Sequence, residues 1–266
     1  MRTALLFVAL TTTTAQARDD IAPHAQLQAT PESELPGLLD RVAATRSTGE
    51  SRAAAAAAVA KLLERGHSDA VTDRALETLT TLGVPQSASI LTQYARHRRP
   101  AARARAFTAL GRIAGSDRAL RQVVADGLRD SVPEVRGAAA RALEALRASE
   151  ATPLLLRALG RGVPEAAVTL GAIGDASSLD GYSAYLKQQP LDVMLAGYAR
   201  YLRRPDLNER AKLDVIARLE DVAGPAVLQF LSGVARDAGL PASIRQSAST
   251  STLRLAKAEA QQGAKP

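Results

Sequence analysis

Few residues in this sequence are of the types that catalyse reactions or bind metals. Cysteine is absent, and His24, His67 and His97 lie far apart, with no second histidine or carboxylate cluster at ligand spacing. Asp175 and Asp180 share a loop, but the alternating carboxylates of a calcium loop are missing. No phosphate-binding glycine loop or nucleophile motif occurs. We therefore expect no metal, no cofactor and no catalytic residue.

Positive charge is concentrated in the middle of the chain. The net charge is +7, and residues 96–161 hold 14 arginines against 6 acidic residues. A basic block can attract nucleic acid, acidic glycans, anionic lipid or an acidic protein. The candidates for such contacts are Arg98, Arg99, Arg103 and Arg136. The alternative is that these arginines lie on solvated helix faces that keep the protein soluble.

Four of the five tyrosines form two pairs with a spacing of three residues, Tyr182 with Tyr185 and Tyr198 with Tyr201. On a helix, this spacing places both members on one face. Tyrosine beside arginine is typical of binding hot spots. The alternative is that these rings fill the core and their hydroxyls reach the surface. The candidate partner-binding residues in this region are Tyr198, Tyr201, Arg200 and Arg203.

The elements that must position these side chains are α-helices. The chain is 46% hydrophobic but only 3% aromatic, and its apolar residues are mainly alanine and leucine, which are strong helix formers. After Pro133, apolar residues recur at steps of four, three, one and three, which is one face of a helix. Related patterns begin at Val71, Ala102, Val135, Ala166 and Leu191, with a weaker copy at Ile244.

The strong copies start 31, 33, 31 and 25 residues apart, a period that fits one helical hairpin per repeat. The partner helices are expected at residues 85–97, 117–128, 150–159 and 177–188. Between residues 202 and 244 the register is lost, although 208–221 and 225–236 still have helical patterns. We predict an all-α fold over residues 35–258, a right-handed superhelical α-solenoid of about six hairpins.

The N-terminus has the layout of a secretory signal peptide. Arg2 supplies the positive charge, residues 4–10 are apolar, and small residues up to Ala17 form a cleavage site. The apolar stretch is too short to span a membrane. We predict cleavage after Ala17, which would place the protein in the periplasm or outside the cell. The remaining segments are an extended leader at 18–34 and a flexible tail at 259–266.

Residues 130–146 resemble a HEAT repeat of the armadillo-like α-solenoids, in particular the bacterial variety also seen in phycobilin lyase-like proteins, and the export signal suggests an exported member. In that family an aspartate before the second helix commonly pairs with an arginine within it. Asp130 and Arg136 occupy these positions, so the resemblance implies a structural pair; Arg103 falls at the arginine position of another copy. The resemblance extends over about residues 71–175 and implies a curved solenoid with a binding role.

These observations favour an exported, non-catalytic scaffold that binds an unknown protein partner on the solenoid surface. The basic block makes an acidic partner one candidate, and we expect a monomer without a transmembrane segment. The alternative is binding of nucleic acid or another polyanion through the arginine-rich centre. The absence of tryptophan, the position of the tyrosines and the export signal argue against nucleic acid. A lyase-like enzyme is a remote alternative, suggested only by the repeat type.

Overall fold

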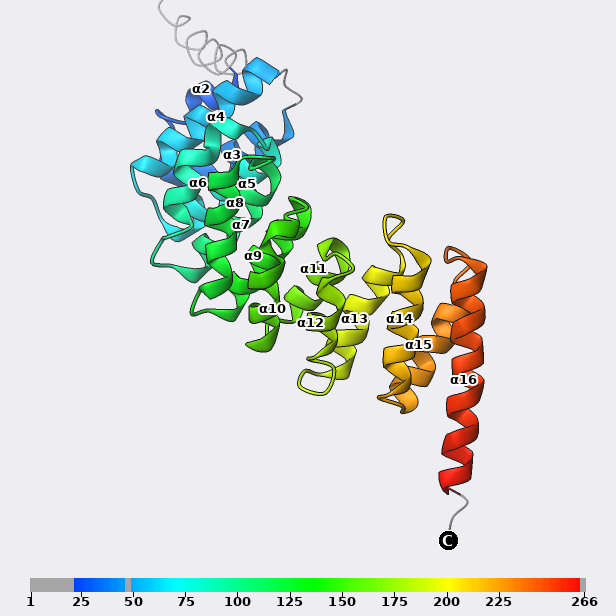
Figure 1. The fold of residues 1–266 in the computed structure, drawn as a ribbon. Helices are drawn as coiled ribbons and strands as arrows, with labels where there is room; N and C mark the ends of the chain where they lie inside the picture. The colour runs from blue at the N-terminus through cyan, green and yellow to red at the C-terminus, as the bar shows by residue number, and fades with distance from the viewer. Residues whose placement is uncertain (1–21, 46–48, 264–266) are drawn as a thin grey trace, which may run out of the picture. The chain divides into compact units, whose positions relative to one another are not determined.

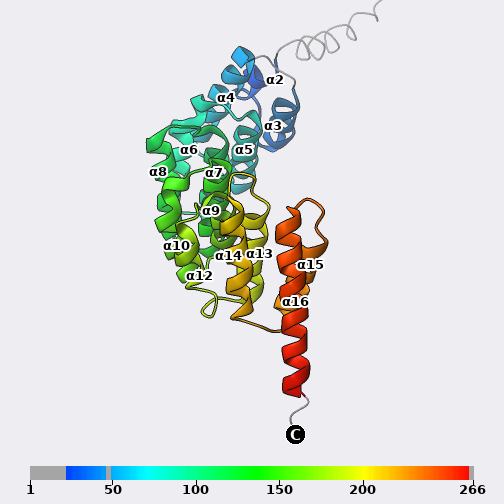
Figure 2. The same cartoon turned by 45° about the vertical axis from the view of Figure 1, so that its right-hand side comes forward.

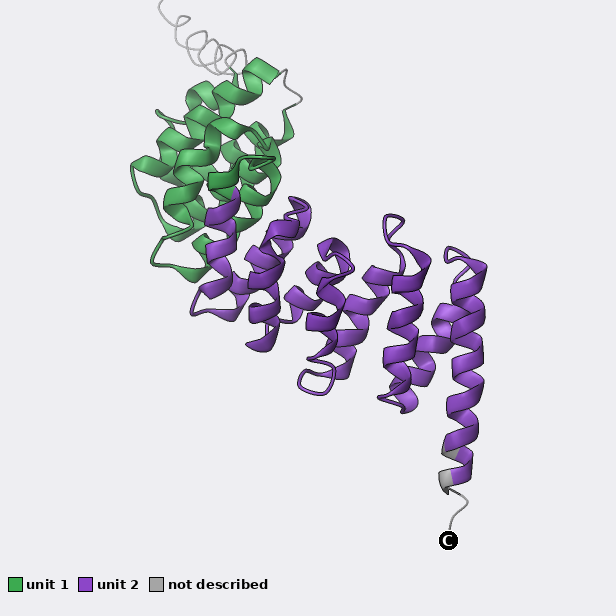
Figure 3. Ribbon diagram, viewed as in Figure 1, with its two compact units in different colours: residues 1–120 green, residues 121–266 purple. Residues whose placement is uncertain are grey.

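The computed structural model describes residues 22–45 and 49–263, and every regular element within them is a helix. The chain forms two compact units, unit 1 over residues 1–120 and unit 2 over residues 121–266 (Figure 3). The expected signal peptide at 1–17 lies outside the described residues.

Unit 1 is a stack of helical hairpins. Its helices are α2 (Pro23–Gln26), η1 (Glu32–Glu34), α3 (Leu35–Ala44), α4 (Gly49–Glu64), α5 (Asp69–Leu82), η2 (Pro85–Ser87), α6 (Ala88–Tyr94) and α7 (Pro100–Ile113), where η marks a 3₁₀ helix. Helices α3, α5 and α7 pack one after another, and α4 and α6 cover α5 and α7 (Figures 1 and 2). Leu39, Leu79 and Leu110 are fully buried between these layers. Each hairpin therefore buries its apolar stripe against the next one.

The leader expected at 18–34 is wrong for the part that the structure describes. Residues 22–34 contain α2 and η1, and α2 packs against α3 and α4. Leu27, which follows α2, is only 1% exposed. Pro23 is the first residue of α2, a position at which proline favours a helix because the first amide needs no intrahelical partner. The first hairpin thus begins before residue 35.

Unit 2 continues the hairpin pattern. Its helices are α8 (Arg118–Asp126), within which the boundary between the units falls, η3 (Gly127–Arg129), α9 (Pro133–Ala145), η4 (Ser149–Ala151), α10 (Thr152–Gly160), α11 (Pro164–Ile173), α12 (Ser178–Ser183), α13 (Leu191–Leu202), α14 (Glu209–Glu220), α15 (Pro225–Arg236) and α16 (Ala242–Gly263). Helices α9, α11 and α13 lie side by side (Figure 1), and α10 and α12 cover α11.

The all-α repeat architecture expected from the sequence is confirmed. Val135 and Ile113, at the expected apolar positions, are buried. Prolines are the first residues of α7, α9 and α11, as expected from their fixed φ. The two helices expected where the register is lost are α14 and α15.

The C-terminal part of unit 2 departs from the expected pattern in two respects. Helix α14 packs against α16, and α15 packs against the same helix, so α16 has two partners. In addition, α16 runs to Gly263, whereas a flexible tail was expected from residue 259. The alanine and glutamine residues of this segment are strong helix formers, and they extend the helix.

Candidate functional site

Tyr198 and Tyr201 are core residues, which corrects their place among the candidate partner-binding residues. Their exposed fractions are 0% and 3%. The Tyr198 hydroxyl donates a hydrogen bond to Ser183 Oγ at 2.8 Å, and its ring meets that of Tyr182 edge to face at 4.9 Å. The alternative interpretation, that these rings fill the core, therefore describes the structure.

Tyr182 is held in the same core region by contacts of its hydroxyl. Its hydroxyl donates to the carbonyl oxygen of Met194 at 2.7 Å and lies against Gly197, where a Cβ atom would collide with it. Burial raises the pKa of Tyr182, so its hydroxyl stays protonated and keeps this hydrogen bond. By contrast, the buried hydroxyl of Tyr201 has no hydrogen-bond partner among the described residues.

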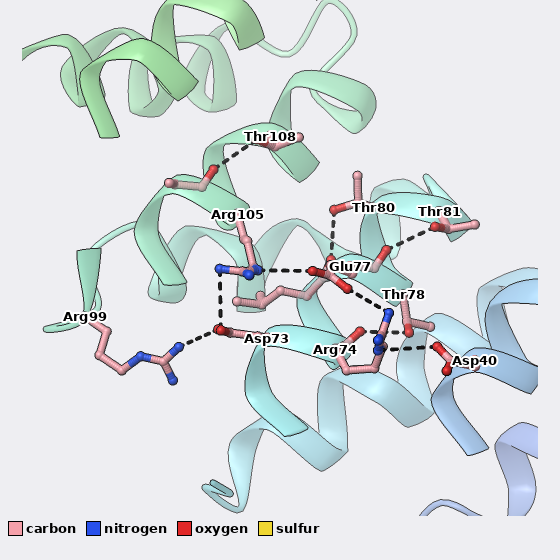
Figure 4. Close-up of polar contacts among 12 residues, drawn as sticks. Asp40, Asp73, Arg74, Glu77, Thr78, Thr80, Thr81, Arg99, Arg105 and Thr108 are labelled. Carbon is pink, nitrogen blue, oxygen red and sulfur yellow. Dashed lines mark hydrogen bonds and ion pairs between the residues drawn. The ribbon is translucent and has the colours of Figure 1, made fainter. Parts of the chain in front are cut away.

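In unit 1, Arg99 is held by acidic residues of the preceding hairpin (Figure 4). Its guanidinium pairs with Asp69 and, at 2.5 Å, with Asp73, both on α5. Arg105 also reaches Asp73 at 3.5 Å and Glu77 at 3.4 Å. Arg99 is thus neutralised by two carboxylates, and a structural role accounts for it. Nothing in these contacts requires a partner.

The network continues across the surface of unit 1. Arg74 of α5 contacts Glu77 at 3.1 Å on its own helix and Asp40 of α3 at 3.4 Å (Figure 4). Charges of alternating sign therefore link α3, α5 and α7 through Asp40, Arg74, Glu77 and Arg105. Such exposed pairs contribute little stability individually. Here they connect helices that already pack against one another.

Arg103 and Arg136 share a structural role. In each case Nη1 donates to the carbonyl oxygens of the residues six and five positions earlier, at 2.9 and 3.1 Å. For Arg136 the first of these acceptors is Asp130, whose carboxylate accepts a hydrogen bond from the Val132 amide at 2.9 Å. The Arg136 side chain thus contacts the main-chain carbonyl of Asp130. Arg103 and Arg136 each stabilise the turn before the helix that contains them. Arg98, by contrast, is exposed.

The basic block is partly neutralised in three dimensions. Asp69, Asp73 and Glu77 precede the block in sequence and Glu165 follows it, yet all four pair with its arginines. Among its described arginines, those that are exposed and whose side chains form no hydrogen bond or ion pair are Arg96, Arg98, Arg118, Arg147, Arg157 and Arg161.

Arg200 and Arg203 remain exposed although both are paired. Arg200 of α13 contacts Glu144 of α9 at 2.6 Å, and Arg203 contacts Asp237 after α15 at 3.0 Å. Neighbouring Arg204 binds Asp206 through two nitrogens, and this pairing lowers the pKa of Asp206. Arg200 and Arg203 are thus accessible to a partner.

A groove of about 1020 Å³ lies in unit 2, beside the C-terminal ends of α9, α11 and α13. Its charged lining residues are Arg141, Arg147, Arg200, Arg204, Glu144, Asp175 and Asp206. Ala145, Ala172 and Ile173 supply apolar surface. The spacing of charges in the sequence did not reveal this groove, because its walls come from three separate repeats.

Arg147, at one end of α9, has an unusual backbone. Its φ is 49°, the only positive value among the described residues other than glycine. The Ala148 amide bonds the Leu143 carbonyl at 3.1 Å, which closes the helix end in the manner that usually selects glycine. A left-handed conformation costs an ordinary residue about 1–2 kcal/mol. Glycine is the residue expected at a helix end of this kind, and arginine occupies that position here.

Within the described residues, no group of three or more histidines, cysteines or carboxylates is placed to hold a metal ion. The sequence predicts a protein without a transmembrane segment, and that prediction concerns the length and polarity of the helices. No described helix is both long enough and apolar enough to cross a bilayer.

Comparison with protein families supports the repeat type over part of the chain. Residues 90–165 match the family model of HEAT repeats. No curated protein matches the sequence. Among solved structures, a designed armadillo repeat protein is 17% identical, with 88% of this chain and 98% of that chain covered and a TM-score of 0.43. The karyopherin Kap121p, bound to the extreme C-terminus of the protein phosphatase Cdc14p, is 16% identical, with 94% and 27% covered and a TM-score of 0.28.

Proposed function

We propose that this chain, a HEAT-type repeat protein over residues 90–165, is a non-catalytic scaffold that binds a protein partner on the surface of its repeats. The observation that carries the proposal is the groove beside α9, α11 and α13. Small-molecule sites are mostly apolar and enclosed, whereas this groove is open and lined with charged side chains. Its chemistry suits an extended segment of another protein.

We also propose that the protein acts in the periplasm or outside the cell. The support is the sequence pattern of residues 1–17, with a positive residue, a short apolar stretch and small residues at Ala17. N-terminal sequencing of the protein from separated cell fractions tests this location. We expect a chain that starts at Arg18 in the periplasm or the culture medium, and an intact Met1 in the cytosol would contradict it.

Site-specific photo-crosslinking in the native host tests the scaffold function. The exposed residue Ala145 lines the groove, so a photo-reactive amino acid there should capture a defined protein. Lys257, exposed on α16, is the matched control position. The captured protein is identified by mass spectrometry, purified and titrated against the full chain. Crosslinking at both positions alike, or no binding between the purified proteins, would refute a partner at this groove.

Polyanion binding is the second candidate function, favoured by the exposed arginines without ion pairs. It predicts binding of duplex DNA with an affinity that falls steeply as salt increases, because bound phosphates release counterions. Arg98→Ala is the informative variant, since Arg98 is exposed, and Arg99→Ala is its contrast, since Arg99 is already paired with two aspartates. Binding that is weak and independent of Arg98 would rule out this candidate.

A further inference from the structure

We infer that the groove beside α9, α11 and α13 binds an acidic peptide segment of the partner protein, and that Arg147 is the residue that selects its charge. The inference rests on the proposed function and names the chemistry of the partner. Three observations carry it: the backbone of Arg147, the charges around the groove, and the apolar residues that also line it.

The backbone of Arg147 indicates that its side chain serves a purpose other than folding. The turns that follow α4, α5, α7 and α10 reach the left-handed region with glycine, at Gly66, Gly83, Gly115 and Gly162. Among the described residues, only Arg147 adopts this conformation with a side chain, and that side chain forms no hydrogen bond or ion pair with them, although its charge helps to lower the pKa of Asp206. Neither the turn nor the packing accounts for an arginine at this position.

The charges around the groove favour an anionic ligand. Two of the three carboxylates in the lining are paired with arginines, Glu144 with Arg200 and Asp206 with Arg204, and Asp175 accepts hydrogen bonds from the Ser177 hydroxyl and the Ser178 amide. The arginines keep donors to spare, because a guanidinium has five N–H groups. Arg147 has used none on the described residues, and Arg200 makes a single contact while 54% of its side chain is exposed. Because four arginines line the groove against three carboxylates, a carboxylate ligand would find free donors and a small excess of positive charge.

The apolar surface in the groove distinguishes a peptide from a simple anion. Ala145 and Ala172 line the same groove as the arginines, and Ala145 is exposed while Ala172 is partly exposed. Small apolar side chains of a ligand can pack on them while its carboxylates reach Arg147 and Arg200. A segment in which glutamate or aspartate alternates with small apolar residues suits a groove lined by both kinds of residue, because an extended chain presents its carboxylates on one side and its apolar side chains on the other.

The probe for the test is a short fluorescein-labelled peptide of alternating glutamate and alanine, added to the full chain at low salt and followed by fluorescence anisotropy. Arg147→Ala and Arg147→Gly should raise its Kd about tenfold, the effect of losing a charge-assisted hydrogen bond. Arg147→Lys retains the charge and should raise Kd much less. The matched control Arg161→Ala removes an exposed arginine outside the groove and should leave Kd unchanged.

Thermal unfolding of the same variants provides an independent readout with the opposite sign. Arg147→Gly removes the backbone strain and should raise Tm by about 2–4 °C. Arg147→Lys and Arg147→Ala keep the strain and should leave Tm near that of the original protein. The peptide affinity should therefore depend on a positive charge at position 147, whereas Tm should rise only when glycine occupies that position.

Several outcomes would overturn the inference. Equal peptide affinity for the original protein and Arg147→Gly would remove Arg147 from the site, and an unchanged Tm in Arg147→Gly would remove the strain argument. Equal binding of a glutamine-for-glutamate peptide would show that charge is not read. Tighter, Arg147-dependent binding of duplex DNA would replace the peptide with a polyanion. If no peptide binds but Ala145 still crosslinks to a verified protein, the inference fails while the scaffold function stands.

Discussion

Gly171 of α11 and Gly197 of α13 lie in direct contact. A Cβ atom on Gly171 would collide with the carbonyl oxygen of Gly197 and would lie 3.0 Å from Cβ of Arg200. The absence of a side chain therefore allows the two helix backbones to approach closely. It also leaves room for Arg200 to pass over α11 and reach Glu144 on α9 at 2.6 Å. A packing feature thus positions a charged residue of the groove.

Replacement of Gly171 by alanine should destabilise unit 2. The added methyl group must displace backbone of α13, and overpacking of this kind costs about 1–3 kcal/mol. Urea denaturation measures the loss. Gly233→Ala is the matched control, because Gly233 lies within α15 with open space around it. That change should be neutral or should stabilise the helix by up to about 1 kcal/mol. A stable Gly171→Ala protein would show that the helices separate at low cost.

The buried hydroxyls of Tyr182 and Tyr201 should respond differently to removal. Tyr182→Phe loses the hydrogen bond to the Met194 carbonyl and leaves that oxygen without its donor, which should lower the unfolding free energy by about 1–3 kcal/mol. Tyr201→Phe removes a buried hydroxyl that has no partner among the described residues, so it should be neutral or stabilising. Urea midpoints of both variants decide between these outcomes, and equal losses would contradict the assigned contacts.

Asp73 should matter more than Asp40, although both pair with arginines. Asp73 binds Arg99 and Arg105, and 24% of its side chain is exposed, whereas Asp40 is 57% exposed and contacts only Arg74. Asp73→Asn should cost about 1–2 kcal/mol because Arg99 and Arg105 each lose one of their two carboxylate partners. Asp40→Asn should cost less than about 0.5 kcal/mol. Chemical denaturation at low and high salt checks this order, and the difference should narrow as salt increases.

Acid should weaken unit 1 through His97. Burial, reinforced by Arg99 and Arg98, lowers the pKa of His97, and its ring stacks on Tyr94 at 5.2 Å. Because the folded-state pKa is below the unfolded value of about 6.5, the contribution to stability is complete above that pH and is lost as the pH falls below it. His97→Asn keeps an acceptor for the Arg99 amide but does not titrate.

Unfolding free energies measured between about pH 7 and pH 5 should therefore decline less in His97→Asn than in the original protein. His24 and His67 are present in both proteins, so their contributions cancel in the comparison. A decline of the same size in both proteins would show that His97 is not responsible.

Most of the fold was predictable because its signals are local. The apolar stripe at Val135 and the prolines that begin α7, α9 and α11 lie within single helices, and the structure has them as expected. The leader was not predictable in the same way. Helix α2 has only four residues, too few for a periodic pattern, and it is held by packing on α3 and α4.

The candidate site was less predictable because its chemistry depends on contacts between repeats. Arg99 appeared as a free cation in the sequence, but its aspartate partners precede it by 26 residues or more. Tyr198 met the spacing of a surface pair and of a core residue equally well, and only packing against Tyr182 decided between them. Arg147 lacked any pattern of its own; its significance comes from the glycines that occupy the comparable turns.

The contact between Arg200 and Glu144 also depends on the number of hairpins between the two residues. The two residues belong to α13 and α9, so the ion pair joins a residue of one repeat to a residue two repeats earlier. Loss of the hairpin α10–α11 by unequal recombination would bring α13 directly against α9 and remove the spacing over which Arg200 reaches. Insertion of another hairpin would separate the two charges. This ion pair is therefore specific to the present order of α9, α11 and α13.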